Sequence, residues 1–239
     1  MGGIIRWKWG PTGAVHTGTF DPSGFSGVGV NYGLFSGGQW SVEVAAPGNF
    51  MYDGGLSLAL SSQGTPYIAF FDDVADVGRI ARRNGPGDWD VELIQALGGE
   101  LEVGRFPHFL IDDAGVLHVA YLTRNSASEG TIRYATGAFG VLTVSDVAPI
   151  SDIQIDTGTD GARNIVGIDF LSDDTPIVIY QSRSVTTVAR GNGGGFDLET
   201  IPAEAGVRLR QQVSFEIDST DRVHMTYWQN SGQVCYGVK

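Results

Sequence analysis

Bulky apolar residues alternate with small ones along many short stretches of this chain. In Ile68-Ala-Phe70 two large side chains flank an alanine, and Val119-Ala-Tyr121 repeats the arrangement. A period of two residues with β-branched and aromatic enrichment is typical of strands packed between two layers. Glycines interrupt every longer pattern, and the sequence shows no capping motif followed by an apolar helical run. The sequence therefore predicts an all-β fold.

The predicted strands recur as a unit of strand, tight turn, strand, loop, strand, turn and strand. The clearest copy covers 58–93, with its first turn at Gly64. Corresponding turn residues mark five copies: Gly13, Gly64, Gly115, Asp174 and Asp221. Aligning the first copy on Gly24 instead leaves too few residues before Trp40 for a third strand. The repeats are therefore placed at approximately 3–46, 54–96, 105–148, 164–203 and 211–239.

Four short strands cannot cover both faces of their own sheet, whereas sheets stacked around an axis cover one another. We therefore expect a single domain, residues 1–239, that forms a five-bladed β-propeller of four-stranded antiparallel blades. A β-sandwich is the structural alternative, but a repeat of about fifty residues fits its irregular strand pairing poorly. The last copy reaches Lys239 after its third strand, so the last blade is expected to be three-stranded and to leave an open outer edge.

The run from Asp112 to Tyr121 has the form Asp-x-x-Gly-x-x-His-x-x-Tyr and is followed by a Tyr-Ala strand. With the Trp-x-x-Glu strands, it resembles the repeats of bacterial sialidase-like, or BNR-type, β-propellers over the whole chain. The resemblance implies the architecture, and such propellers include hydrolases, lyases, lectins and interaction modules. The complete Asp-box pattern, Ser-x-Asp-x-Gly-x-x-Trp, does not occur in the sequence, and no arginine triad can be assigned in order.

Composition and charge argue against two classes of binding partner, nucleic acids and membranes. The 239 residues are 42% hydrophobic, which is enough for a core without metals or disulfides, and the formal charge is −12. Phosphate binding needs clustered Lys and Arg, so we expect no nucleic-acid partner. No apolar stretch in the sequence could cross a bilayer, and no membrane insertion is expected. The protein is expected to be cytoplasmic, or secreted or on the cell surface if a leader or larger chain is missing.

Residues that repeat are interpreted as structural. His16, His118 and His224 hold the same place in three repeats, so they cannot readily converge on one metal ion, and each is expected to fix its own turn. The Trp-x-x-Glu elements also repeat, with Trp or Phe expected to cover a blade edge and Glu to be solvated. Their members are Trp40/Glu43, Trp89/Glu92 and the variant Phe196/Glu199.

Three acidic motifs are interpreted as turns. Asp21, in Phe20-Asp-Pro-Ser-Gly24, resembles the nucleophile motif of five-bladed furanosidases, but the motif places no acid partner and is also an ordinary turn sequence. The spacing from Asp156 to Gly161 departs from a calcium loop at its third and twelfth positions. The cluster of Asp72, Asp73 and Asp76 has the same two interpretations, a calcium loop and a solvated turn. No catalytic or metal-binding residue is assigned, and no cofactor is expected.

Irregular loops are the better guide to binding, because binding residues concentrate on loops held by a rigid scaffold. The loops entering each first strand vary most, and they are expected to share one face with the links between second and third strands. Arginines, carboxylates and aromatics on that face would suit an anionic or hydroxyl-rich ligand. The alternative is that each side chain only satisfies its local backbone. The candidate ligand-binding residues are Tyr52, Asp53, Arg105, Asp160, Arg163, Arg210 and Trp228.

Three functions are consistent with these sequence features. The leading hypothesis is a non-catalytic propeller that recognises a glycan or a protein surface through that face. The second is a carbohydrate-active hydrolase or lyase with Asp53, Asp169 or Glu216 as its acids, which would need two carboxylates flanking the scissile bond. The third is a structural module whose incomplete last blade pairs with another chain. The sequence leaves the oligomeric state open.

Overall fold

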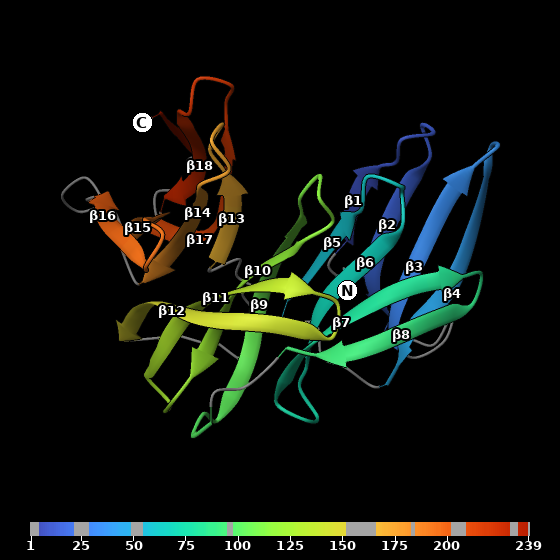
Figure 1. Ribbon diagram of the computed structural model, residues 1–239, viewed down its shortest axis with the longest axis horizontal. Helices are drawn as coiled ribbons and strands as arrows, with labels where there is room; N and C mark the ends of the chain where they lie inside the picture. Colours follow the sequence, from blue (N-terminus) through green and yellow to red (C-terminus); the bar gives the residue numbers. More distant parts are fainter. Residues whose placement is uncertain are drawn as a thin grey trace.

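The computed structural model describes residues 5–21, 29–48, 55–94, 98–151, 166–182, 185–201, 209–229 and 234–238 (Figure 1). Every regular element in these ranges is a β-strand, which confirms the all-β prediction. None of the described residues belongs to a helix that could span a membrane.

The strands follow one another as antiparallel meanders in which each strand pairs with the next. The first meander contains β1 (Ile5–Trp9), β2 (Val15–Asp21), β3 (Gly29–Ser36) and β4 (Gln39–Pro47). The second contains β5 (Leu56–Leu60), β6 (Pro66–Asp72), β7 (Val77–Gly85) and β8 (Asp88–Leu93). The third contains β9 (Glu102–Ile111), β10 (Leu117–Arg124), β11 (Glu129–Ala138) and β12 (Val141–Ser151). The fourth contains β13 (Val166–Phe170), β14 (Pro176–Ser182), β15 (Val185–Gly191) and β16 (Phe196–Ile201), and the last contains β17 (Leu209–Ile217), β18 (Val223–Gln229) and β19 (Val234–Val238).

The same tight turn joins the first two strands of every meander. Its last residue has a positive φ in all five copies, and the backbone N–H of that residue donates to the carbonyl three residues earlier. Glycine reaches this conformation without steric cost, and aspartate tolerates it better than most residues. The five turn residues are those that the repeat spacing predicted: Gly13, Gly64, Gly115, Asp174 and Asp221.

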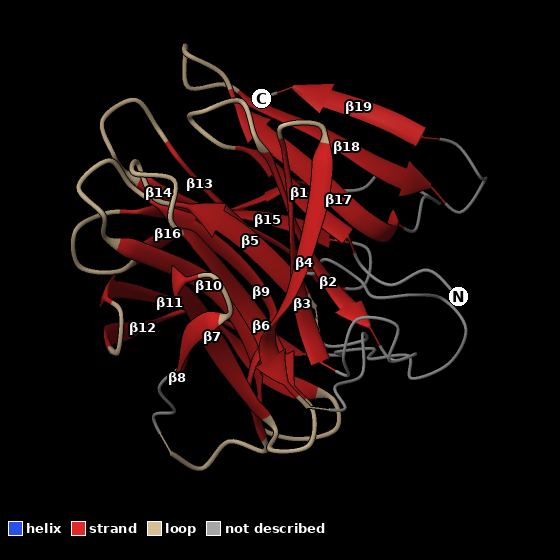
Figure 2. Cartoon of the chain, turned by 90° about the vertical axis from the view of Figure 1, so that its right-hand side faces the viewer, coloured by secondary structure: helices blue, strands red, loops and turns tan. Residues whose placement is uncertain are grey.

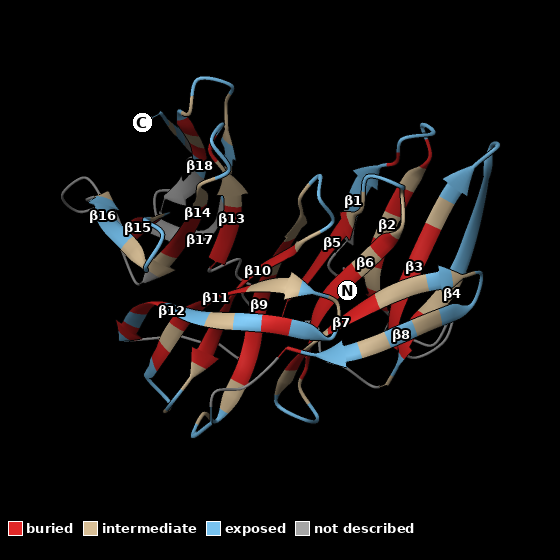
Figure 3. Ribbon diagram, in the orientation of Figure 1, coloured by how far each residue is buried: buried red, intermediate tan, exposed pale blue. Residues whose placement is uncertain are grey.

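Consecutive meanders pack face to face, and four apolar clusters fill the four junctions. Phe20 and Tyr32 of the first meander, for example, pack with Leu58 and Phe70 of the second. The next three junctions are filled in the same way. Figure 3 shows that the buried segments lie along the strands, whereas most of the turns that connect the strands are exposed. Burial of apolar area between sheets is therefore the main stabilising contribution.

Polar contacts also join the first strands, which lie next to one another in chain order. The Phe109 N–H donates to Ser57 Oγ at 3.1 Å, and the Ile168 N–H lies 3.1 Å from His108 Nδ1. The Ile217 N–H donates to Asp169 Oδ2 at 3.1 Å. These contacts satisfy backbone groups that the meanders leave unpaired at their inner edges.

One junction departs from the expected separate blades. Val77 of β7 pairs in parallel with Val103 of β9, and this pairing joins the second and third meanders into one eight-stranded sheet. The strands of each meander are nevertheless called one sheet, so that β5 to β8 are the second sheet and β9 to β12 the third. Two glycines permit this approach. A Cβ on Gly104 would lie 2.5 Å from the Gly78 Cα, and Gly104 has a φ of 91°. The backbones can meet only because both positions lack a side chain.

The meanders are arranged along an arc. In Figure 1 the sheet of β1 to β4 lies at one end, the strands of the fourth and last meanders lie together at the other end, and the second and third meanders lie between them. Figure 2 shows the same stack of strands from the side. The repeat architecture is therefore present, while the first and last sheets do not close a ring in this arrangement.

The glycine contact predicts a large difference between two alanine substitutions. Gly104→Ala should lower the free energy of unfolding by more than about 2 kcal/mol, because a strained φ and a backbone clash act together. Gly87→Ala should cost about 1 kcal/mol, since Gly87 has a similar φ of 72° but no neighbour within 4 Å of its would-be Cβ. Urea denaturation measures both, and equal losses would contradict the proposed close approach.

Candidate functional site

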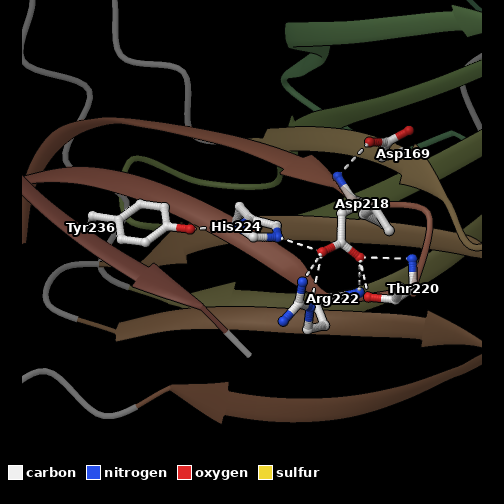
Figure 4. A network of polar contacts seen from close by, with 7 residues as sticks. Asp169, Asp218, Thr220, Arg222, His224 and Tyr236 are labelled. Carbon is white, nitrogen blue, oxygen red and sulfur yellow. Dashed lines mark hydrogen bonds and ion pairs between the residues drawn. The ribbon is translucent and has the colours of Figure 1, made fainter.

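A tyrosine, a histidine and an aspartate form a connected set in two meanders. In the last meander His224 Nδ1 lies 2.5 Å from Tyr236 Oη, and His224 Nε2 lies 2.8 Å from Asp218 Oδ2 (Figure 4). In the third meander His118 makes the same contacts with Tyr134 at 2.6 Å and Asp112 at 3.3 Å. Such a set superficially resembles a catalytic relay.

Its hydrogen bonds show a structural role instead. An ionised aspartate can only accept, so His Nε2–H donates to the aspartate and the tyrosine O–H donates to Nδ1. The aspartate also caps the turn, because Asp112 accepts from the Val116 N–H and Asp218 from the N–H groups of Thr220 and Arg222. The prediction that each histidine fixes its own turn is confirmed for these two sets.

The surroundings of these groups shift their pKa values in consistent directions. Burial lowers the pKa of His16 and of His118, where the neighbouring Asp112 opposes the shift. Burial raises the pKa of Tyr32, which contacts His16 Nδ1, to about 12. Hydrogen bonds from Thr220 and His224 hold the pKa of the Asp218 carboxyl well below its usual range. The buried histidines are therefore neutral at pH 7.

Glu43 differs from its prediction, because it is not a solvated residue. Its carboxylate accepts from Arg83 Nε at 2.5 Å, from the Gly87 N–H at 2.8 Å and from the Trp89 indole N–H at 2.9 Å. Burial raises the pKa of Glu43, but the bonds from these three donors outweigh it and lower that pKa overall. Glu43 thus joins the first sheet to the second, whereas Glu92 and Glu199 of the same repeated motif are exposed, as predicted.

A second group of charged residues, Arg82 and Asp90, lies on the second sheet where it faces the third sheet. Arg82 Nη2 donates to Asp90 Oδ2 at 2.7 Å, from neighbouring strands of one sheet. The Phe139 ring, in the β11–β12 turn, covers the guanidinium with its centroid 4.5 Å from Arg82 Cζ. A ring from the next sheet therefore occupies the space above the Arg82/Asp90 pair.

The fourth sheet carries the equivalent charges but leaves the space above them open. Arg190 and Asp197 are register partners on neighbouring strands, as Arg82 and Asp90 are, and Glu199 follows Asp197 on the same strand. The last sheet has three strands among the described residues, so none of them supplies a fourth-strand cover there. A pocket of about 320 Å³ lies at this junction, lined by Ile177, Val188, Arg190, Asp197, Leu198, Glu199, Asp221, Arg222 and Val223.

The pocket combines an apolar floor with a charged rim. Ile177, Val188 and Val223 are buried, whereas Arg190 and Glu199 are exposed. Parts of the rim are held in place: Asn192 Nδ2 donates to Asp197 Oδ1, and the Ser172 N–H and hydroxyl donate to Asp221. Arg222 is an ion-pair partner of Asp218 at 2.8 Å. The pocket thus offers donors and acceptors above an apolar surface.

The predicted loop face is only partly described. Tyr52, Asp53, Asp160 and Arg163 lie outside the described residues. Arg210 and Trp228 are register partners on β17 and β18, so the backbone brings these two positions together, but their side chains lie outside the description. The proposed face stays a prediction for these six residues.

Arg105, the remaining predicted residue, lies in the interior. Its side chain is buried, its Nε lies 2.6 Å from Glu102 Oε2 without hydrogen-bond alignment, and its guanidinium lies 4.8 Å from the Phe71 ring centroid. Sequence reasoning misses the pocket because Glu199 repeats along the fourth strands, which favours a structural interpretation, and because no motif singles out Asp197 or Arg190. The signal that could have found them is the missing fourth strand of the last repeat.

The other candidate acids have structural partners or lie elsewhere. Asp169 accepts two backbone N–H bonds, from Phe170 and Ile217, so its carboxylate is committed to a sheet junction. Glu216 is exposed on β17. Asp72 accepts from the N–H groups of its turn and pairs with Arg79 at 2.7 Å. The 156–161 motif and the Asp21 side chain lie outside the described residues, and among those described no cluster could hold a metal ion.

Comparison with known proteins defines the fold. No family model and no curated protein sequence matches the chain. Among solved structures, the chain is similar to the six-bladed β-propeller lectin of the fungus Aleuria aurantia, with a TM-score of 0.64, 14% identity, and coverage of 99% of this chain and 75% of the lectin. It is similar to the lectin SapL1 at a TM-score of 0.58 and 12% identity, covering 99% and 81%.

A third similar structure is the polysaccharide lyase Uly1, with a TM-score of 0.54, 10% identity and coverage of 98% of this chain. The chain spans 57% of that lyase. At such identities the likeness concerns the fold alone. With the stacked meanders described above, it defines the chain as a β-propeller protein.

The neutral histidines predict how stability depends on pH. The folded chain resists protonation of His16 and His118, whereas the unfolded chain takes up protons near pH 6.5, so their stabilisation is complete above that pH and is lost as pH falls below it. Each histidine contributes a slope of at most about 1.4 kcal/mol per pH unit. The variant His16→Gln/His118→Gln should show a shallower decline between pH 7 and pH 5 in urea titrations. If the free energy of unfolding declines with the same slope in this variant, the buried histidines are not neutral in the folded chain.

Proposed function

We propose that this protein is a non-catalytic carbohydrate-binding β-propeller, and that the pocket between the fourth and last sheets holds a sugar ring. The observation that carries the proposal is the pocket's composition: Arg190 and the carboxylates of Asp197 and Glu199 surround a floor of Ile177 and Val188. Sugars present hydroxyl groups at their edges and C–H groups on their faces. A guanidinium donates to such hydroxyls and a carboxylate accepts from them, while the floor packs against C–H groups.

The size of the pocket also fits. A volume of about 320 Å³ is at the lower end of the range for small-molecule sites, as expected for a monosaccharide or disaccharide. At the equivalent position of the second sheet the space accommodates the six-membered ring of Phe139 above Arg82. A ring of similar size bound at Arg190 would take the place that an aromatic side chain takes there.

Similar structures support the same class of ligand. The Aleuria aurantia lectin is described with a novel fucose recognition mode, and SapL1 is in complex with α-methyl fucoside. We further propose that the five meanders are five blades around one axis, in a sialidase-like arrangement. The loop-bearing face with Tyr52, Asp53, Asp160, Arg163, Arg210 and Trp228 remains a second proposed contact for a longer glycan.

The pocket predicts which substitution abolishes binding. A glycan array followed by calorimetry on the best ligand should show that Arg190→Met weakens binding about tenfold or more, because a hydrogen bond from a charged group is worth about 1.5–3 kcal/mol. The matched control is Arg82→Met, in which the equivalent arginine is lost beneath Phe139. This control should bind the glycan as tightly as the unchanged protein.

Three outcomes would contradict the proposal. A glycan array on which the protein binds no glycan would contradict the proposed carbohydrate-binding function. Equal affinities of Arg190→Met and the unchanged protein would place the site elsewhere, for example on the loop-bearing face. Turnover of the bound glycan, lost on changing Asp197 or Glu199, would favour the hydrolase or lyase alternative.

A further inference from the structure

The first strands of neighbouring sheets are joined by a side-chain contact that occurs at two successive junctions. Ser57 Oγ accepts from the Phe109 N–H at 3.1 Å, between the second and third sheets. The Ile168 N–H donates to His108 Nδ1 at 3.1 Å, between the third and fourth sheets. We call this contact, made by a side chain of one first strand and a backbone N–H of the next, the inner latch.

Strand register shows that the two inner latches hold equivalent positions of the repeat. The two acceptors pair with Ala69 of β6 and Ala120 of β10, which are equivalent residues of the second strands. The two donors lie one position further along and pair with Val119 of β10 and Val178 of β14. A serine at one junction therefore takes the place that a histidine takes at the next.

The two acceptors differ in how they depend on pH. A serine hydroxyl oxygen accepts a hydrogen bond at any pH. An imidazole Nδ1 accepts only in the neutral tautomer that carries its proton on Nε2, and a protonated imidazole has two donors and no acceptor. Because the Ile168 N–H can only donate, protonation of His108 would place two donors against each other. The inner latch between the third and fourth sheets therefore needs a neutral His108.

His108 can exchange protons with the solvent, and it lies beside an irregular part of β9. Its side chain is half-buried, whereas Ile168 is 1% exposed. The β9–β10 register shifts between Arg105 and His108. Within that interval Phe106 has a φ of 51°, and Pro107 has no N–H to donate. Fewer ladder bonds therefore hold this part of β9, and the inner latch makes a larger share of its attachment.

Other titratable and charged groups lie on the strands packed at this junction. They are His118 and Arg124 of β10, Tyr134 of β11, Asp169 of β13 and Tyr180 of β14. The ring nitrogens of His118 bind Tyr134 and Asp112 of its own sheet, so protonation of His118 leaves the latch acceptor in place. Arg124 pairs with Glu102, and Asp169 accepts from two backbone N–H groups. Burial raises the pKa of Tyr134 and of Tyr180, so both stay neutral.

We propose that His108 makes the junction between the third and fourth sheets a pH-sensitive hinge, whose inner latch is closed at neutral pH and opens when His108 is protonated. The latch needs the neutral form, so its stabilisation is present above the ordinary histidine value of about pH 6.5 and is lost as pH falls below it. Glu43 and the parallel β7–β9 pairing tie the first three sheets together, so the fourth and last sheets would move relative to them. The inference does not depend on the sugar pocket.

Hydrogen exchange measured by NMR on the unchanged protein tests the proposal. Rates at pH 7 and at pH 5 are each divided by the rate of an unstructured chain at the same pH. The protection of the Ile168 amide should fall about tenfold between pH 7 and pH 5, because a buried donor loses its acceptor. The Phe109 amide, whose acceptor is a serine, is the internal reference and should keep its protection within about twofold.

Two substitutions assign the effect to one histidine. In His108→Asn the side-chain carbonyl oxygen takes the place of Nδ1 and accepts at any pH, so the protection of the Ile168 amide should be equal at pH 7 and pH 5. The matched control is His118→Gln, which removes the neighbouring imidazole. It should leave the pH dependence of the Ile168 amide as it is in the unchanged protein.

Three results would overturn the proposal. Equal protection of the Ile168 amide at both pH values in the unchanged protein would show that the latch does not respond to protonation. Equal losses at Ile168 and Phe109 would indicate loosening of the whole chain instead of a hinge at one junction. A pH dependence that persists in His108→Asn and disappears in His118→Gln would assign the effect to His118.

Discussion

The face-to-face packing of consecutive sheets is the interaction on which the rest of this structure depends. Each meander is too small to bury its own apolar side chains, so every face needs a neighbour. Phe70 and Tyr32 are buried only because the first and second sheets meet, and Ile168 is buried only because the third and fourth do. The turns, the strand register and the polar contacts all place these faces against one another.

The candidate site follows from the same constraint. At two junctions the following sheet contacts the charged residues of the third and fourth strands: Arg83 and Trp89 bind Glu43, and the Phe139 ring covers Arg82. At the junction with the three-stranded last sheet, the equivalent residues Arg190 and Glu199 line a pocket. One repeated set of residues therefore stabilises some junctions and provides the proposed sugar site at another.

Much of the fold could be predicted from the sequence, because its determinants are local. A glycine or aspartate with positive φ is required at the first turn of each repeat, and the five such residues could be identified from their spacing alone. The binding chemistry could not be identified in this way. Glu43 and Glu199 have the same place in their repeats, and only the neighbouring sheet decides that one is bound by Arg83 while the other lines a pocket. The Gly78 and Gly104 contact could not be predicted either, since it joins β7 of the second meander to β9 of the third.

Small-angle X-ray scattering tests most directly the claim that consecutive sheets pack face to face. A chain of 239 residues packed in this way should be compact, with a radius of gyration of about 18 Å. A radius clearly larger than that of a compact chain of this length would show that consecutive sheets do not pack on one another, and would contradict the claim.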